Sequence, residues 1–361
     1  MVTTMTRPGT ALAGLGIFVS VGGCQEDLPE QRISGEYVHV YKAEDAEFCA
    51  GSLAYMDAHV EAMAAMFGLD LPSIDFFWVG HEDVPKFCTP GARACYQYRE
   101  ERIISSYVPD THELVHAMHG SNGLGLDQFL GEGLAYLFEE NLPWEERDLA
   151  GSIEELLGFA DPSSNLPATL LGRAAHFAWF LLDRYGAGPV DLLTRRRLAG
   201  RSIEAQDQVM LEVTGETLGE ALAAYKEVPE CPLAEFRAAL VECSAPLVPW
   251  DAAPAQTWSS VVTLGCERDD VLGPVSGVMW TTRAFEVEAG GEYQVSALGA
   301  GLDTALVVVA RCGSRCGDAF YQVLRPGESR VFDLKPGRYY TMLVRHVEDP
   351  GEIGLSVLGV H

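Results

Sequence analysis

Residues 244–257, with the sequence SAPLVPWDAAPAQT, divide the chain into two parts of different character. This stretch holds three prolines and several alanines, a composition typical of a linker. Before it, apolar residues recur mostly at steps of three and four, the spacing of amphipathic helices; after it, short apolar runs alternate with turns rich in glycine and proline. We therefore predict an α+β domain over residues 36–245, a linker over 246–257 and an all-β sandwich over 258–361.

The first part is predicted to begin with strands and to continue with helices. Strands are expected at residues 35–41, 74–79 and 102–107, and a helix at residues 49–67 carries apolar side chains along one face. Strands that precede a run of helices favour an α+β arrangement. The helices expected after the strands cover residues 111–118, 128–140, 153–159, 166–185, 190–199, 203–213, 218–226 and 233–243.

The second part is predicted to consist of short strands. The turns between them include AGG at 289–291 and KPG at 335–337. Short strands with turn signals at close intervals are typical of a β-sandwich. The strands are expected at residues 284–287, 293–297, 305–309, 329–334, 339–344 and 353–357.

The N-terminus has the features of an export signal. Arg7 precedes the apolar stretch 11–21, which has the length of a signal peptide and is too short to span a bilayer. The residues that follow, VGGC ending at Cys24, resemble the lipobox of bacterial lipoproteins. That resemblance implies a signal peptide over 1–23, membrane attachment through a lipidated Cys24, a tether over 24–35 and a location in the cell envelope. The alternative is a secreted protein with an incidental cysteine.

The charge balance excludes several classes of partner. The chain has 52 acidic residues against 25 lysines and arginines, a formal net charge of −27. Such a chain repels phosphate backbones and anionic lipid surfaces, so we expect no nucleic-acid partner and no docking on membranes through a basic patch. Hydrophobic residues make up 48% of the chain, enough to bury real cores. The sequence leaves the oligomeric state open.

The cysteines beyond Cys24 indicate disulfides, because their number is even and the chain carries an export signal. Short separations favour pairs of Cys88 with Cys95 and of Cys231 with Cys243, although eight cysteines allow about 105 connectivities. A metal on the CGSRC stretch at 312–316 would need a second close pair, which the sequence lacks. The cysteines are Cys49, Cys88, Cys95, Cys231, Cys243, Cys266, Cys312 and Cys316.

The strongest chemical signal is the sequence HELVH at residues 112–116. Two histidines four residues apart project from the same face of a helix, so His112 and His116 can bind one cation together. Glu113 follows the first histidine and can reach a water molecule on that cation. Asp110 or Thr111 is a natural N-cap for this helix.

A second motif, FLGEGLAY at residues 129–136, supplies a carboxylate. A glycine-containing turn at 121–126 can reverse the chain, which would bring Glu132 back toward the two histidines. Two imidazoles and one carboxylate leave one position of a tetrahedral ion open for water, as a catalytic zinc site requires. We therefore predict Zn²⁺ on His112, His116 and Glu132, with Glu113 as the general base.

These motifs resemble those of the gluzincin metallopeptidases, in particular the peptidase-MA-like families. HELVH and GEGLAY match the first and second motifs, and AAHFAWFLLDRYG at 174–186 is similar to a later helix of those families. The resemblance covers about residues 36–245. It implies a zincin-type fold, the ligand set His112, His116 and Glu132, and hydrolysis of peptide bonds in a peptide or protein substrate by zinc-activated water with Glu113 as base.

Two positions depart from that pattern. His176 stands where the relatives commonly have serine. Tyr136 stands where the thermolysin type has an acidic residue that orients a histidine ligand, so Asp110 or Glu139 is expected in that orienting role. A developing oxyanion also needs a donor beyond the metal. His176 is the predicted catalytic residue beside Glu113 for this purpose, with Tyr136 and Tyr185 as weaker candidates.

Three questions stay open in the sequence. Strand 102–107 is either an exposed edge that accepts an extended peptide or an ordinary internal strand. The C-terminal part resembles the pre-peptidase C-terminal type of β-sandwich, on GLDTAL at 301–306 and LKPGRYY at 334–340, and no second catalytic set is present in its sequence. Its role is either to bind substrate or surface glycans, or to protect and space the enzyme. The alternatives to a peptidase are a binding protein on a degenerate scaffold, a zinc hydrolase for a non-peptide bond such as a cell-wall amide, and a purely structural zinc site.

Overall fold

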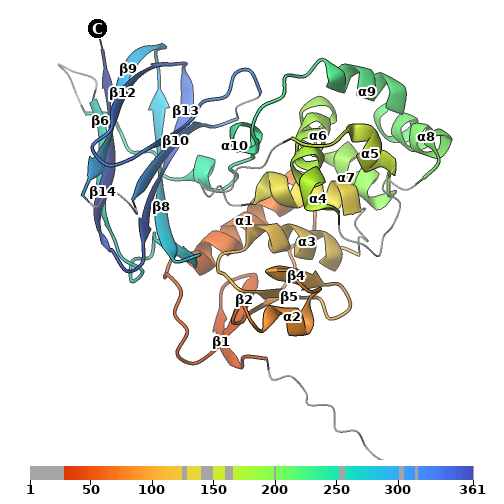
Figure 1. Cartoon of the computed structure of the whole chain (residues 1–361), viewed down its shortest axis with the longest axis horizontal. Helices are drawn as coiled ribbons and strands as arrows, with labels where there is room; N and C mark the ends of the chain where they lie inside the picture. The colour runs from red at the N-terminus through yellow and green to blue at the C-terminus, as the bar shows by residue number, and fades with distance from the viewer. Residues whose placement is uncertain are drawn as a thin grey trace, which may run out of the picture.

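The computed structural model describes residues 28–123, 128–139, 149–158, 166–198, 201–251, 257–300, 305–313 and 316–360. The predicted signal peptide, Cys24, part of the turn at 121–126 and most of the linker after residue 251 lie outside the described residues. The chain combines helices and several sheets, consistent with the α+β class (Figure 1). Within the described residues, none of the helices has both the length and the apolarity that spanning a membrane requires.

A five-stranded mixed sheet lies at the bottom of Figure 1, in the order β1-β2-β3-β5-β4. Strands β2, β3 and β5 are parallel, while β1 and β4 run antiparallel along the two edges. The long helix α1, Ser52–Phe67, connects β2 to β3, because a parallel pair requires a crossover. The strands are β1 Gln31–Ser34, β2 Val38–Lys42, β3 Ile74–Trp78, β4 Ala94–Gln97 and β5 Arg102–Ser105.

Helices cover one face of this sheet and continue into a helical cluster. Alternate strand residues such as Val40 and Phe76 are buried and share a core with Met56 of α1 and Leu114 of α3. After α3 the chain is helical as predicted, apart from the boundaries. The helices are α2 Val84–Phe87, α3 Thr111–Ser121, α4 Gln128–Phe138, α5 Ile153–Gly158, η1 Ala168–Leu170, α6 Leu171–Tyr185, α7 Ala187–Arg195, α8 Ile203–Thr214, α9 Leu218–Lys226, α10 Leu233–Phe236 and η2 Glu242–Ser244.

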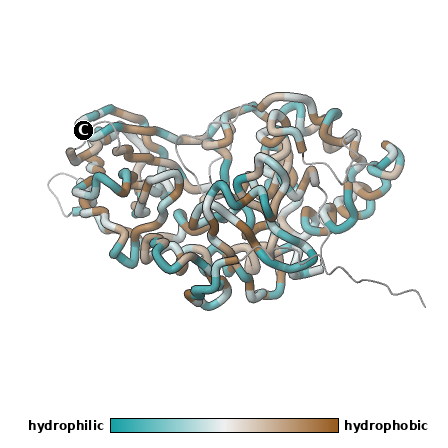
Figure 2. Tube along the Cα trace, turned by 60° about the horizontal axis from the view of Figure 1, so that its bottom comes forward, coloured by the Kyte–Doolittle hydropathy of each residue, from teal (hydrophilic) through white to brown (hydrophobic). Residues whose placement is uncertain are grey.

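The second part is an antiparallel β-sandwich, at the left of Figure 1. Its sheets have the orders β11-β10-β13-β8-β7 and β12-β9-β14-β6, and their facing side chains form one core around Trp258 and Phe285. Brown hydrophobic stretches run through both parts of the tube in Figure 2. The strands are β6 Thr257–Leu264, β7 Leu272–Val275, β8 Val278–Val287, β9 Gly291–Gly299, β10 Leu306–Arg311, β11 Tyr321–Leu324, β12 Ser329–Leu334, β13 Gly337–His346 and β14 Gly351–Gly359.

The two parts pack together through a third apolar cluster. Tyr55 of α1 is buried against Trp280 and Tyr340, which lie on the outer face of the five-stranded sheet of the sandwich. The hydroxyl of Tyr55 donates to Glu242 at 2.7 Å. Segment 244–251 also lies along the sandwich, since Val248 N donates to Ala284 O at 2.9 Å. The residues of this segment therefore form part of the contact between the two parts.

The disulfides confirm one predicted pair and correct the other. Cys88 pairs with Cys95 as expected. Cys231 pairs with Cys316, and Cys243 pairs with Cys312, so the predicted Cys231–Cys243 pair is wrong. The reason is that the helix expected over 233–243 ends at Phe236. Ala238 N then donates to Leu137 O of α4, and the chain continues to the sandwich. A further pair, Cys49–Cys266, also joins the two parts, and four disulfides indicate an oxidising environment.

Some predicted elements differ from the structure. The tether expected over 24–35 contains strand β1, whose residues are exposed and pair with β2. Strand β5, expected at 102–107, is internal, and β4 is the edge strand beside it. Strand β4 was not predicted, because four residues between a disulfide loop and a turn carry too short a pattern. In the sandwich, β6, β7 and β11 were likewise not predicted.

Candidate metal centre

Helix α3 presents the two predicted histidine ligands. It begins after Asp110, whose side chain accepts a hydrogen bond from Glu113 N at 3.1 Å, the bond that an N-cap provides. The other oxygen of Asp110 accepts from the Ser105 hydroxyl at 2.8 Å and ties the start of the helix to the end of β5. The ring nitrogens of His112 and His116 then meet one turn apart on the same face of α3.

Helix α4 supplies the carboxylate of Glu132, and Gly133 fixes the position of this helix against α6. A Cβ atom at Gly133 would lie 2.6 Å from the carbonyl oxygen of Ala174 in α6. Only glycine therefore allows α4 and α6 to approach this closely. Glu132 is the residue before Gly133 and faces α3. Its carboxylate lies close to both histidines.

Three donor groups converge on one point. His112 Nε2 lies 3.3 Å from His116 Nε2 and 3.5 Å from a Glu132 oxygen, and His116 Nε2 lies 3.6 Å from the other oxygen. Donor atoms around a tetrahedral ion with bonds of about 2.0–2.1 Å are about 3.3–3.4 Å apart. The observed separations therefore fit a metal ion, and these residues form a group that could hold one.

The three groups shift one another's pKa values. Burial lowers the pKa of His112, but hydrogen bonds to Glu132 and Glu139 outweigh burial and raise that pKa well above its usual value. Burial lowers the pKa of His116 to about 4. Burial raises the pKa of Glu132, but His116 and His112 outweigh it, so the net pKa lies below the usual value. Glu132 as a carboxylate and His116 as a neutral imidazole are competent ligands, whereas His112 must release its proton when a metal binds.

Glu113 lies beside the donor group and is nearly shielded from solvent, with 7% of its surface exposed. Burial raises the pKa of Glu113 to about 8, with smaller contributions from Asp110 and Glu132; His112 and a backbone hydrogen bond from Tyr96 act in the opposite direction. A divalent cation on the neighbouring ligands would lower this pKa by stabilising the carboxylate. The charge of Glu113 therefore depends on whether a cation is bound to the neighbouring ligands.

Further side chains support the histidines. His112 Nδ1 lies 3.7 Å from an oxygen of Glu139, one of the two residues expected to orient the histidines. Tyr136, one turn after Glu132, packs its ring edge-on against His112 with centroids 4.6 Å apart. The Nδ1 atom of His116 is buried and has no hydrogen-bond partner among the described residues.

The structure does not bring His176 to this group. The side chain is 1% exposed, and its Nδ1 lies 2.8 Å from the Tyr225 hydroxyl. Its Nε2 lies 3.4 Å from Cys316 Sγ, and its ring contacts Trp179 and Phe236. An imidazole enclosed in this way cannot face a substrate oxyanion. Its contacts give His176 a structural role beneath the Cys231–Cys316 disulfide, and the prediction of a catalytic role has no support in the geometry.

Strand β4, which was not predicted from the sequence, also contributes to the site. The backbone of Tyr96 bonds to Glu113, and the Tyr98 ring packs against the Tyr96 ring with centroids 4.8 Å apart. The pKa of Tyr98 is raised by burial and by the nearby charges of Glu132 and Glu113. The alternation of Tyr96 and Tyr98 in YQY was the available signal, but the strand was too short to be recognised.

Comparisons with known proteins add little to this geometry. No protein-family model matches the chain, and no curated protein matches it. Among solved structures, the pre-peptidase C-terminal domain of collagenase from Bacillus anthracis matches with 20% identity and a TM-score of 0.21, covering 28% of this chain and 88% of that domain. The periplasmic g-type lysozyme inhibitor PliG of Aeromonas hydrophila matches with 15% identity and a TM-score of 0.21, covering 32% of this chain and 93% of that one. Similarity at this level carries no argument about function.

Proposed function

We propose that this protein is a zinc-dependent metallopeptidase that hydrolyses peptide bonds outside the cytoplasm. His112, His116 and Glu132 would hold the ion, and Glu113 would be the general base. The observation that carries the proposal is the convergence of two imidazole nitrogens and one carboxylate at separations of 3.3–3.6 Å. Imidazole and carboxylate donors that leave a position open suit catalytic zinc, whereas structural zinc sites are mostly closed by cysteines.

The residues of the chain would divide the work as follows. A bound zinc ion would supply a Lewis acid that acidifies water and polarises a carbonyl group. Glu113 adjoins the first ligand in α3, and its carboxylate is held by the backbone of Tyr96. From this position Glu113 would take a proton from water and pass it to the leaving amine. Glu139 would keep the His112 ring in the orientation that points Nε2 toward the ion.

Strand β4 would bind the substrate. It pairs with β5 on one side and is the edge of the sheet, so its other side can accept an extended peptide through backbone hydrogen bonds. The bond between Tyr96 and Glu113 brings this strand next to the general base. A peptide aligned along β4 would therefore pass close to the donor group.

The location of the enzyme follows from the other predictions. The disulfides suit an oxidising compartment. A lipid on Cys24 would keep the enzyme at the cell envelope, in which case radiolabelled fatty acid should enter the wild type and not a Cys24→Ser variant. A fully secreted protein would show no label in either.

Metal analysis and proteolysis test the proposal. The purified wild type should contain about one equivalent of zinc, and His116→Ala should lose it, because two remaining ligands bind zinc weakly. His81→Ala is the matched control, since His81 is an exposed histidine outside the donor group. Glu113→Gln should keep the metal and lose cleavage of unfolded casein by about a hundredfold or more. Equal casein cleavage by wild type and Glu113→Gln would refute the enzyme proposal, while cleavage of peptidoglycan alone would point to a different hydrolase.

A further inference from the structure

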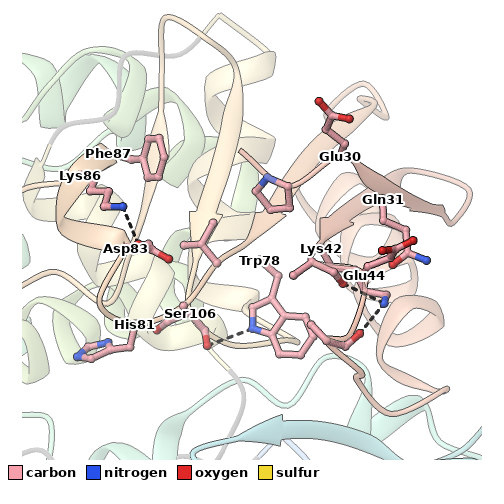
Figure 3. Close-up of a pocket in the computed structure, with 15 residues that line it drawn as sticks. Glu30, Gln31, Lys42, Glu44, Trp78, His81, Asp83, Lys86, Phe87 and Ser106 are labelled. Atoms are coloured by element: carbon pink, nitrogen blue, oxygen red, sulfur yellow. Dashed lines mark hydrogen bonds and ion pairs between the residues drawn. The ribbon is translucent and has the colours of Figure 1, made fainter. Parts of the chain in front are cut away.

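A cleft lies at the end of the mixed sheet, and its lining includes none of the residues of the donor group. It has a volume of about 960 Å³ and opens where β2 and β3 end, at Lys42 and Trp78, and at Ser106 directly after β5. Figure 3 shows its lining residues. Ligands of open sheets commonly bind outside the carboxyl ends of parallel strands. We refer to this space as the strand-end cleft.

The cleft contains a buried cation without a counter-ion. Lys42 is 7% exposed, and its Nζ donates to the carbonyl oxygens of Ala43 at 3.3 Å and Ala46 at 2.5 Å. None of the carboxylates in the described residues forms an ion pair with it. Lysine is almost never buried unless it is paired, because carbonyl dipoles solvate the charge without neutralising it.

The other buried cations of the described chain are paired. Arg173 binds Glu230 at 2.6 Å, and Arg345 binds Asp349 at 2.7 Å. Lys42 is therefore the exception, and one of its three N–H donors remains for a partner in the cleft. An anionic group from outside the chain would supply the missing charge.

The remaining walls indicate what that group is attached to. The indole N–H of Trp78 donates to Ser106 O at 3.2 Å, so the ring is held in place in the wall of the cleft beside Lys42, whereas Phe87 lines the opposite side (Figure 3). Lys86 at the far side is already paired with Asp83 at 2.8 Å. A ligand can thus place an apolar body on the Trp78 ring while its charged end reaches Lys42.

The rim limits the charge of the ligand. Glu30 and Glu44 line the cleft, and both are exposed. Two carboxylates at the rim disfavour a multiply charged anion such as phosphate, whereas a single carboxylate can still pair with the buried ammonium. We propose that the strand-end cleft binds a carboxylate that is attached to an apolar or aromatic body. The carboxylate belongs either to a free small acid or to the C-terminus of a peptide.

Calorimetric titration of the full chain with N-acetyl-phenylalanine and with its amide tests this inference. The acid should bind, and the amide, which has the same shape without the charge, should bind about tenfold or more weakly. The titration is repeated with the His116→Ala variant, so that binding at the metal centre cannot account for the result. Equal binding of acid and amide, or binding of neither at about 10 mM, overturns the proposal.

Two variants identify the groups involved. Lys42→Met should weaken binding of the acid about ten- to a hundredfold, and Glu44→Gln should strengthen it by removing a repelling charge. Glu44 is exposed, so Glu44→Gln stays informative even where Lys42→Met does not fold. Weaker binding of the acid to Glu44→Gln would mean that Glu44 attracts the ligand and does not repel it, and the proposal would be wrong. A peptide ending in phenylalanine separates the two sources, since much tighter binding of the peptide than of the small acid identifies a C-terminus as the ligand.

Discussion

Gly133→Ala is expected to weaken metal binding through a contact that does not involve the ligands directly. The added Cβ would lie 2.6 Å from the carbonyl oxygen of Ala174 and 3.3 Å from Cβ of Ala178. An ordinary contact between carbon and oxygen needs about 3.2–3.4 Å, so α4 and α6 must separate by about 0.6–0.8 Å. The obstacle is backbone of α6, which cannot rotate away. Glu132 is the adjacent residue and must move with α4.

The two effects of this substitution differ in size. Overpacking costs about 1–3 kcal/mol, and the better helix propensity of alanine returns about 1 kcal/mol, so the free energy of unfolding should fall by about 0–2 kcal/mol. Metal–ligand distances tolerate only about 0.2 Å, so the affinity for zinc should fall about tenfold or more. Urea denaturation in EDTA measures the first effect, and competitive zinc titration of the folded protein measures the second.

Gly188→Ala is the matched control, because Gly188 lies in α7 and a Cβ there meets no atom within 4 Å. This variant should keep its zinc affinity and its stability or become slightly more stable. If folded Gly133→Ala binds zinc as tightly as the wild type, the close packing of α4 on α6 does not set the position of Glu132, and the reasoning fails.

Three further changes test other parts of the structure. Burial lowers the pKa of His59 to about 3, so the stability this group provides is present above pH 6.5 and is lost as the pH falls below that value. In EDTA, the free energy of unfolding should fall by about 2 kcal/mol more between pH 7.5 and 5 for the wild type than for His59→Met, and equal slopes in urea titrations would contradict this. Replacing Cys49 and Cys266 by alanine opens a loop of 217 residues and should cost about 5 kcal/mol in calorimetry, whereas an unchanged melting temperature would show that the link adds nothing. His176→Phe removes the bond to Tyr225 and should destabilise the protein by about 1–3 kcal/mol, yet the kcat/KM for peptide cleavage by the folded protein should stay within about threefold of the wild type, and a hundredfold loss would restore the catalytic role.

Local patterns predicted the donor group. The spacing of His112 and His116 fixes their common face on a helix, and Asp110 is the N-cap that the sequence suggested. Glu132 needed only one reversal of the chain to reach them, and the structure brings it there. These inferences depend on the geometry of two neighbouring helices, which short-range sequence determines well.

Long-range relations were not available from the sequence. Whether β5 or β4 lies at the edge depends on the strand order of the sheet, which the alternation within one strand does not encode. The partner of Cys231 is 85 residues away, whereas the entropy of loop closure alone favours the nearby Cys243. His176 was assigned from the resemblance of one helix, although its buried neighbours come from α9, α10 and the sandwich. Burial and pairing across distant segments decided each of these cases.

The sandwich is a structural part of the protein and not a detachable module. The outer face of its five-stranded sheet buries Trp280 and Tyr340 against Tyr55, so separation would expose a second apolar face in addition to the core between the sheets. Three disulfides cross the same contact, and one of them starts directly before α1. Helix α1 shares its core with α3, which presents the histidines. The sandwich therefore stabilises α1, which in turn packs against α3. If the sandwich binds a ligand, it does so from a fixed position relative to the metal centre.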